Sequence, residues 1–230
     1  MAIEVQGSPS GIKFEAETTH KAQRITGRPM ELGARGAYAL GVQTGILAAA
    51  LGANSEIFQF RWISSTLVAL IRSIRISACV STTFFAAGVP VQIALRVARG
   101  WSADGTGGTA VVFSTANTNK KRTDFALSAL SDTGVRIATT AALGAGTKTL
   151  DTNRVSFIAA PGPITASLNG QIIQPGTILW QRDTSDEYPL LLEQNEGIVI
   201  ESVAVPATGT WTVAVQIEWA ELDPAVVTGW

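Results

Sequence analysis

The chain has 230 residues, of which 46% are apolar and 15% charged, and its formal net charge is −1. A chain this close to neutrality is not expected to bind nucleic acid through its overall charge, and its single cysteine excludes an intrachain disulfide. The 22 glycines and the many Val, Ile and Thr residues favour an all-β fold.

Residues 1–36 differ from the rest of the chain. Breaker sequences stand at 7–11 (GSPSG) and 26–29 (TGRP), and charged residues of both signs are dense. We therefore expect an extended N-terminal arm that packs on something else. The start of the chain lacks the basic residues and continuous apolar core of a signal peptide, and no apolar window is long enough to span a bilayer. We expect a soluble protein made in a cytoplasm.

Alternating apolar residues predict a β-sandwich domain over residues 37–224, followed by a C-terminal tail at 225–230. A helix over 65–74 is conceivable, but the β-branched and Ser residues there favour a long strand. Roughly eight to ten strands separated by turns suit an antiparallel two-sheet sandwich or jelly roll. The expected strands lie at 38–46, 57–62, 67–85, 91–98, 110–113, 155–157, 172–180, 198–203 and 211–219.

The clearest strand pattern lies between Tyr188 and Glu221. Two runs of strand-forming residues flank a turn cluster at 206–210, which predicts a β-hairpin. In the second run Trp211 and Trp219 share a face with aliphatic residues, so this face is expected to be buried. Trp62 is also predicted to point inward. The positions of the remaining tryptophans are left open; they are Trp101, Trp180 and Trp230.

No group of residues predicts catalysis or metal binding. His20, the only histidine, lies in the arm without a recognisable nucleophile or orienting carboxylate. One histidine and one cysteine cannot make a conventional zinc site, and we expect Cys79 to be a buried, unreactive thiol. We therefore predict that the protein is not an enzyme and holds no cofactor or metal.

Two loops resemble ligand-binding motifs only superficially. The Gly-rich stretch 104–109 (DGTGGT) lacks the Lys-Ser/Thr pair and the following helix of a phosphate-binding loop, so a flexible turn is expected. Asp183, Asp186 and Glu187 lack the spacing and central glycine of a calcium loop, and we interpret them as solvated acids.

Charge is unevenly distributed along the chain. Residues 1–100 hold ten Lys and Arg against five Asp and Glu, whereas residues 161–230 hold one Arg against nine Asp and Glu. Either a basic face of one subunit meets an acidic face of another, or the charges intermix within one folded chain. The only basic run is Lys120, Lys121 and Arg122, which is typical of a solvated loop and also suits contact with an acidic partner or nucleic acid.

Four segments resemble a group of tailed-bacteriophage virion proteins, most of them recorded only as structural or hypothetical proteins. The segments are GAYALGVQTGILAAALGANSEIFQFRW (36–62), RVARGWSADGTGGTA (96–110), TAALGAGTKTLDTN (140–153) and EYPLLLEQNEGIVIESVAVPATGTWTVAVQIEWAE (187–221). The resemblance covers about residues 24–222 and is most specific in the second segment and in the NEG…PATGTW stretch. It implies a virion component and supplies no catalytic residues.

From this resemblance and the low charge we hypothesise a head decoration, or cement, protein of a tailed phage. It is expected to bind between major capsid subunits, to be made in the host cytoplasm and to reside in the virion head. We expect a homo-oligomer, with a trimer at three-fold positions, and neither specific nucleic acid nor membrane as a partner. The expected capsid-contact residues are Ile12, Phe14, Arg24, Arg28, Lys120, Lys121 and Arg122.

Two alternatives stay open. The protein could instead belong to the phage tail, as a fibre, baseplate or host-adhesion component. It could also be a carbohydrate-binding or carbohydrate-cleaving β domain, which needs paired carboxylates in a groove. Glu193 and Glu196 are the candidate pair, although solvated turn acids explain them more simply.

Overall fold

The computed structural model describes residues 3–4, 13–14, 35–48, 51–86, 88–115, 119–162, 170–182, 189–205 and 207–227. Nearly all regular structure in these residues is β. The elements are β1 (Ile3–Glu4), β2 (Lys13–Phe14), β3 (Gly36–Gln43), β4 (Leu47–Ala48), β5 (Ser55–Trp62), β6 (Val68–Val80), β7 (Val91–Ala103), β8 (Thr109–Ala110), β9 (Val135–Ile137), β10 (Thr147–Leu150), β11 (Ser156–Ala160), β12 (Gln171–Gln181), β13 (Leu191–Leu192), β14 (Glu196–Ala204), β15 (Thr210–Leu222) and the single helical turn α1 (Pro224–Val227).

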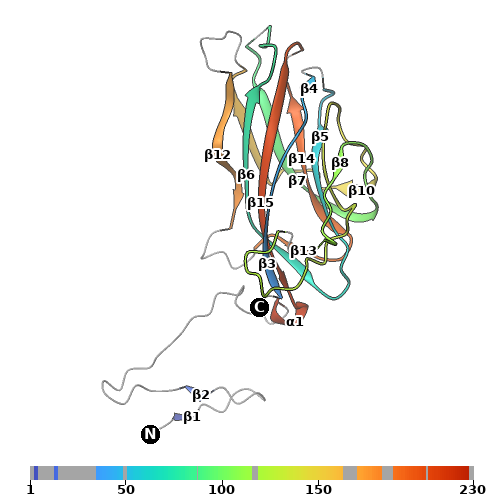
Figure 1. Cartoon of the computed structure of the whole chain (residues 1–230), viewed down its shortest axis with the longest axis vertical. Coiled ribbons are helices and arrows are strands. Elements are labelled where there is room, and N and C mark those ends of the chain that lie inside the picture. The colour runs from blue at the N-terminus through green and yellow to red at the C-terminus, as the bar shows by residue number, and fades with distance from the viewer. Residues whose placement is uncertain are drawn as a thin grey trace, which may run out of the picture.

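Two antiparallel sheets pack face to face (Figure 1). The six-stranded sheet has the order β12-β6-β15-β3, with β13 beside β6 and β4 beside β15. The seven-stranded sheet has the order β10-β7-β14-β5-β9-β8, with β11 also beside β7. The short strands β1 and β2 form a separate antiparallel pair, in which Ile3 lies opposite Phe14. The predicted all-β two-sheet sandwich is confirmed.

The strand order is that of a jelly roll. Along the chain the long strands are β3, β5, β6, β7, then β10 with β11, β12, β14 and β15. The first of these pairs with the last, the second with the last but one, and so inward, which gives β3–β15, β5–β14, β6–β12 and β7 with β10 and β11. This is a long antiparallel hairpin rolled into two sheets, as in other jelly rolls.

The predicted hairpin over 188–221 is wrong. β14 lies between β7 and β5 in the seven-stranded sheet, whereas β15 lies between β6 and β3 in the six-stranded sheet. The two strands therefore face each other across the core instead of pairing. Alternation correctly identifies which side chains point inward, but it carries no information about the sheet to which each strand belongs.

The segment for which a helix was conceivable is a strand, β6, as its β-branched residues favoured. Its alternation places Ile74, Ile76 and Ala78 toward the core, where each is nearly inaccessible to solvent. The predicted strand over 91–98 is longer than expected, because β7 continues to Ala103.

Aromatic residues fill the centre of the sandwich. Trp62, Trp211 and Trp219 are fully buried, which confirms their predicted inward orientation. Tyr38 stacks on Trp219 with a ring-centroid distance of 5.4 Å, and the rings of Phe60 and Phe113 meet Trp219 edge-on. Each such side chain contributes roughly 1.5–3 kcal/mol through burial alone. Trp101 is also buried, but on the outer face of the seven-stranded sheet.

A buried carboxylate fastens a loop to the end of β15. Glu221 is 1% exposed, and its Oε1 accepts hydrogen bonds from Ser128 Oγ at 2.5 Å, Ala129 N at 3.1 Å and Trp219 Nε1 at 3.2 Å. Burial raises the pKa of Glu221, although these hydrogen bonds and the charge of Arg35 partly offset it.

We expect a chain that ends at residue 195 not to fold. It lacks β14, which joins β5 to β7, and β15, which joins β3 to β6. Neither sheet can therefore form. Circular dichroism and urea titration would measure this, with a chain ending at residue 222 as the matched control. A cooperative unfolding transition in the shorter chain would contradict the prediction.

Glu221→Ala is expected to lower the free energy of unfolding by about 2–4 kcal/mol, because it leaves buried donors on Ser128, Ala129 and Trp219 unpaired.

Glu221→Gln keeps an acceptor oxygen and removes the buried charge. Since the pKa of Glu221 is higher in the folded than in the unfolded chain, the folded state holds more protons between the two pKa values, and stability falls as pH rises through that interval.

In parallel urea titrations the Gln variant should therefore lose less stability than the wild type as the pH rises above the ordinary pKa of a glutamate. Identical pH dependence in the two proteins would show that Glu221 is not responsible.

Candidate functional site

Most of the predicted arm residues lie outside the described residues. This applies to Ile12, Arg24 and Arg28 among the expected capsid contacts, and to His20. Of Phe14 only the backbone is described, as part of β2. The acidic loop with Asp183, Asp186 and Glu187 and the terminal Trp230 also lie outside the described residues.

The predicted basic run and the preceding residue Asn119 form backbone hydrogen bonds with the edge of β3. Ala39 N donates to Asn119 O at 2.9 Å, and Lys121 N donates to Ala37 O at 2.9 Å. Lys120 lies opposite Tyr38 as an isolated antiparallel bridge. These bonds cover part of the outer edge of the six-stranded sheet, where an open strand would be a site for unwanted pairing.

The three basic side chains are engaged within the chain. Lys121 Nζ lies 2.5 Å from Glu218 Oε2, and Arg122 NH2 lies 2.5 Å from Asp124 Oδ2. Lys120 Nζ donates to Phe125 O at 2.9 Å. An acidic partner would therefore compete with acids of this chain for two of the three charges, which makes the run a weak candidate for the principal contact surface.

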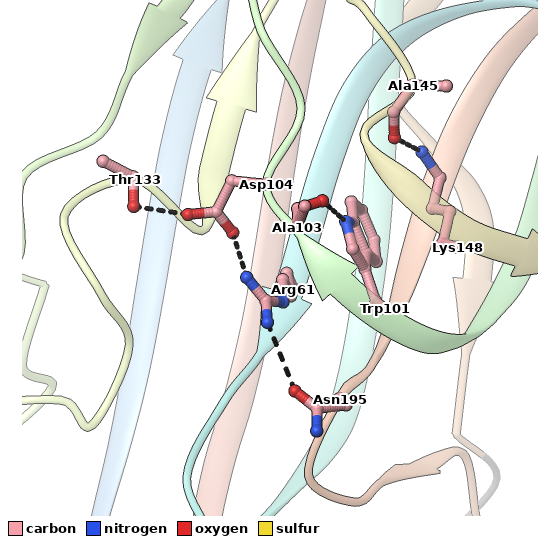
Figure 2. Close-up of polar contacts among 8 residues, drawn as sticks. All are labelled: Arg61, Trp101, Ala103, Asp104, Thr133, Ala145, Lys148 and Asn195. Atoms are coloured by element: carbon pink, nitrogen blue, oxygen red, sulfur yellow. Dashed lines mark hydrogen bonds and ion pairs between the residues drawn. The ribbon is translucent and has the colours of Figure 1, made fainter.

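The four segments that carry the phage resemblance meet on the outer face of the seven-stranded sheet. Figure 2 shows Arg61 of β5 between Asp104 and Asn195. Arg61 NH1 lies 2.6 Å from Asp104 Oδ1, and Arg61 NH2 donates to Asn195 Oδ1 at 3.2 Å. Asp104 also accepts from Thr133 Oγ1 at 2.6 Å. These bonds tie the connections that follow β7 and precede β14 to the C-terminal end of β5.

A second part of this network contains a buried ion pair. Lys148 Nζ lies 2.8 Å from Glu56 Oε2, with side-chain exposures of only 2% and 8%. The same ammonium group lies 4.4 Å from the centre of the Trp101 ring and donates to Ala145 O (Figure 2). The Trp101 ring lies directly on Gly197, where a Cβ atom would be 2.7 Å from it. The pair is thus held by both charge and cation–π attraction.

The stretch 104–109, expected to be a flexible turn, contains bends at Gly107 and Gly108 and contacts the sheet and a neighbouring loop closely at Gly105 and Thr106. Gly105 is buried so close to Gln59 that a Cβ atom would lie 2.0 Å from Gln59 Oε1. Thr106 and Gly144 exchange two backbone hydrogen bonds, at 3.2 and 2.9 Å. The glycines therefore allow two loops and the sheet to approach closely, which composition alone does not distinguish from flexibility.

The electrostatics of this site favour the ionised form of Asp104. Burial alone would raise the pKa of Asp104, but hydrogen bonds from Thr133 and Arg61 and the charges of Arg61 and Arg136 outweigh it and lower the pKa. The pKa of Asp104 lies below its ordinary value as a result. The geometry holds loops in place and brings no nucleophile to a general base.

Ion pairs join the basic first part of the chain to its acidic last part. Arg96 Nε lies 2.9 Å from Glu201 Oε1, and Arg99 NH1 lies 2.5 Å from Glu196 Oε1. In these pairs, charges separated in sequence intermix within one folded chain. Glu196 also accepts from the backbone N of Glu193 at 2.9 Å, so these two predicted candidates lie in one turn.

The described residues contain no group of three or more His, Cys, Asp or Glu that could hold a metal ion. Within the same part of the chain, no helix is long and apolar enough to cross a membrane.

The outer face of the six-stranded sheet is hollowed. One hollow of about 440 Å³ lies over β3, β15 and β6 beside Gly176, and a second of about 240 Å³ adjoins it. The two share Gln43, Ser77 and Ala214 as lining residues. We call them together the sheet groove; it is marked by Gly41, Gln43, Arg75, Ser77, Cys79 and Gln216.

The prediction that Cys79 is a buried thiol is wrong. Cys79 is exposed, lines the smaller hollow and lies with its Sγ 3.2 Å from Thr212 Oγ1. Because Ile76 and Ala78 on β6 are buried, the odd-numbered residues Ser77 and Cys79 lie on the outer face. The prediction was wrong because the apolar residues beside Cys79 in the sequence suggested a buried position, whereas they point to the opposite face of the strand.

Sequence reasoning also missed Arg75, which stands between Ile74 and Ile76 and is exposed in the groove. The period-two pattern of β6 contains the signal that Arg75 is outward-facing. Nothing in the pattern indicates that strands far away in sequence surround it with uncharged residues, with Gln216 and Ile178 directly beside it.

Comparison of the chain with protein-family models, with curated proteins and with solved structures finds no match.

Asp104→Asn is expected to lower the free energy of unfolding at pH 7 by about 1–2 kcal/mol, because it weakens the charge-assisted bond to Arg61. The lowered pKa of Asp104 means that its contribution is present above the unfolded-state pKa and is lost as pH falls through the folded-state pKa. The difference between wild type and variant should therefore shrink below about pH 4.

Urea titrations at several pH values would measure this difference. Asp151→Asn, at the exposed pair with Arg99, is the matched control and should cost under about 1 kcal/mol. An Asp104 variant as stable as this control would contradict the assigned role of the network.

Proposed function

We propose that the protein is a structural component of a tailed-phage virion, and specifically a head decoration protein that binds between major capsid subunits. The resemblance of four segments to phage virion proteins is the starting point. In the folded chain all four contribute to one set of contacts: Arg61 bonds to Asp104 and Asn195, and Trp101 links these to Lys148. The backbone N of Trp101 donates to Asn195 O at 2.7 Å, and its ring lies against the Lys148 ammonium group. The resemblance thus concerns one connected structural unit, which strengthens it as an argument.

The observation that carries the binding role is the outer face of the six-stranded sheet. Of the described residues that line the sheet groove, Arg75 is the only charged one. Typical protein surfaces are richer in charge, and hollowed, weakly charged faces are common where proteins dock. A protein that binds in many symmetric copies can rely on such modest surfaces, since each contact is repeated over the whole shell.

The fold is compatible with this role without determining it. Jelly rolls occur in viral capsid proteins, lectins and cupins, so fold alone cannot select among virion, carbohydrate-binding and other functions. In the proposed mechanism the sandwich bridges neighbouring capsid subunits, the segment before β3 adds contact area, and the protein acts as a homo-oligomer, with a trimer favoured. Its action is mechanical: it resists the outward pressure of packaged DNA.

The full-length protein is expected to cosediment saturably with expanded, undecorated capsids of its phage. A chain that begins at residue 35 and gives an unchanged circular dichroism spectrum should bind more weakly, because it lacks the proposed additional contacts. Densitometry of pelleted protein against free concentration would give both affinities.

No cosedimentation by the full-length protein would refute the head assignment. Immunolabelling of intact virions would then show whether the protein is in the tail, the alternative location.

A further inference from the structure

We propose that the sheet groove binds an extended acidic peptide segment of the capsid partner, with Arg75 as the residue that pairs with its carboxylate. This inference rests on the proposed function and names the contact surface and the chemistry of the bound segment.

The groove has the shape of a peptide site. Its floor is the flat middle of β3, β15 and β6, where Gly41 lies opposite Gln216 and Gln216 lies opposite Arg75. Along β3 the larger hollow runs from Ala39 to Gln43, which is roughly 13 Å and the length of four or five extended residues. A segment lying along the strands can fill it.

One side of the groove lies along an irregular stretch of β12. The register of β12 against β6 shifts between Ile173 and Thr177, and Pro175 and Gly176 within this stretch line the two hollows. Ile178 nearby on the same strand is 50% exposed. Ile178 lies opposite Arg75 in register, so an extended segment lying along the strands can contact both side chains.

Charge selects the chemistry of the occupant. The Arg75 side chain is exposed and has no hydrogen-bond or ion-pair partner among the described residues. The acid nearest in register, Glu218, lies two residues beyond Gln216 on β15 and is held by Lys121. A free guanidinium in an otherwise uncharged groove favours a carboxylate, with which it can form two parallel hydrogen bonds.

The remaining polar groups of the groove suit a peptide backbone. Gln43 and Gln216 offer amide donors and acceptors on either side of Gly41, and Ser77 offers a hydroxyl group. A Cβ atom at Gly41 would meet nothing within 4 Å, so the space above it is open. The same opening allows the groove to be blocked by substitution with little disturbance of the fold.

The test uses full-length variants in the capsid cosedimentation assay. Arg75→Glu and Gly41→Phe should each weaken binding by about tenfold or more, the first by reversing the charge and the second by filling the groove. Arg99→Gln, an exposed arginine on the other sheet, is the matched control and should bind within about twofold of the wild type. Thermal unfolding of each variant would verify that the fold is intact.

The single cysteine allows the occupant to be identified directly. A benzophenone photo-crosslinker attached through maleimide to Cys79 lies at the smaller hollow, and mass spectrometry of the adducts locates its target. Adducts on a segment of the capsid protein that contains Asp or Glu are expected. Cys79→Ser protein carried through the same reaction supplies the background.

The outcomes separate the two proposals. Wild-type affinity in both the Arg75→Glu and Gly41→Phe proteins overturns the groove inference and leaves the decoration role standing. Adducts on residues 1–34 of this chain, or on the sandwich of a second copy, overturn it as well and assign the groove to that occupant. Failure of the wild-type protein to bind capsids refutes the decoration role, and the groove inference falls with it.

Discussion

The structure depends on the insertion of its last two long strands into the middle of the two sheets. Of the long strands of the first half, β3, β5, β6 and β7, none pairs with another of this group. β15 joins β3 to β6, and β14 joins β5 to β7. The sheets therefore become continuous only when the C-terminal part of the chain is present. Because these pairings close long loops, the entropic cost of forming them precedes most of the gain from burial, which is typical of slowly folding β proteins.

The two sheets differ in what covers their outer faces. The seven-stranded sheet carries the loops that follow β7 and precede β10, and a partly buried network with Arg61, Asp104, Lys148 and Trp101 holds them there. Removing such ions from water is costly unless each is well paired. The main effect of the network is therefore to fix the position of the loops on the sheet, and its net contribution to stability is smaller. The outer face of the six-stranded sheet instead remains open in its middle, over Gly41 and Ala214. We therefore propose that this second face is the binding surface.

The sequence predicted the fold class and the inward faces well, because both depend on period-two alternation within single strands. Trp211 and Trp219 are buried as expected, and β6 is a strand throughout. The errors concern relations between distant segments. The supposed hairpin failed because alternation does not assign strands to sheets, and the groove around Arg75 is assembled from β3, β6, β12 and β15. Cys79 was misplaced because apolar neighbours along a strand say little about its outer face.

A single charged residue, Arg75, can make the proposed docking groove selective for an acidic segment. An exposed guanidinium is well hydrated, so any partner that covers it without supplying a negative group leaves a desolvated, unpaired charge, which is strongly unfavourable. A carboxylate replaces the hydrogen bonds that the guanidinium group loses to water. Its two oxygens also fix the relative orientation of the two groups. The net gain in affinity over water is small, but the penalty for a neutral or basic segment is large. In the proposed complex, a lone arginine in an uncharged groove would therefore act mainly on specificity, and the repetition of the contact over a symmetric shell would provide the strength.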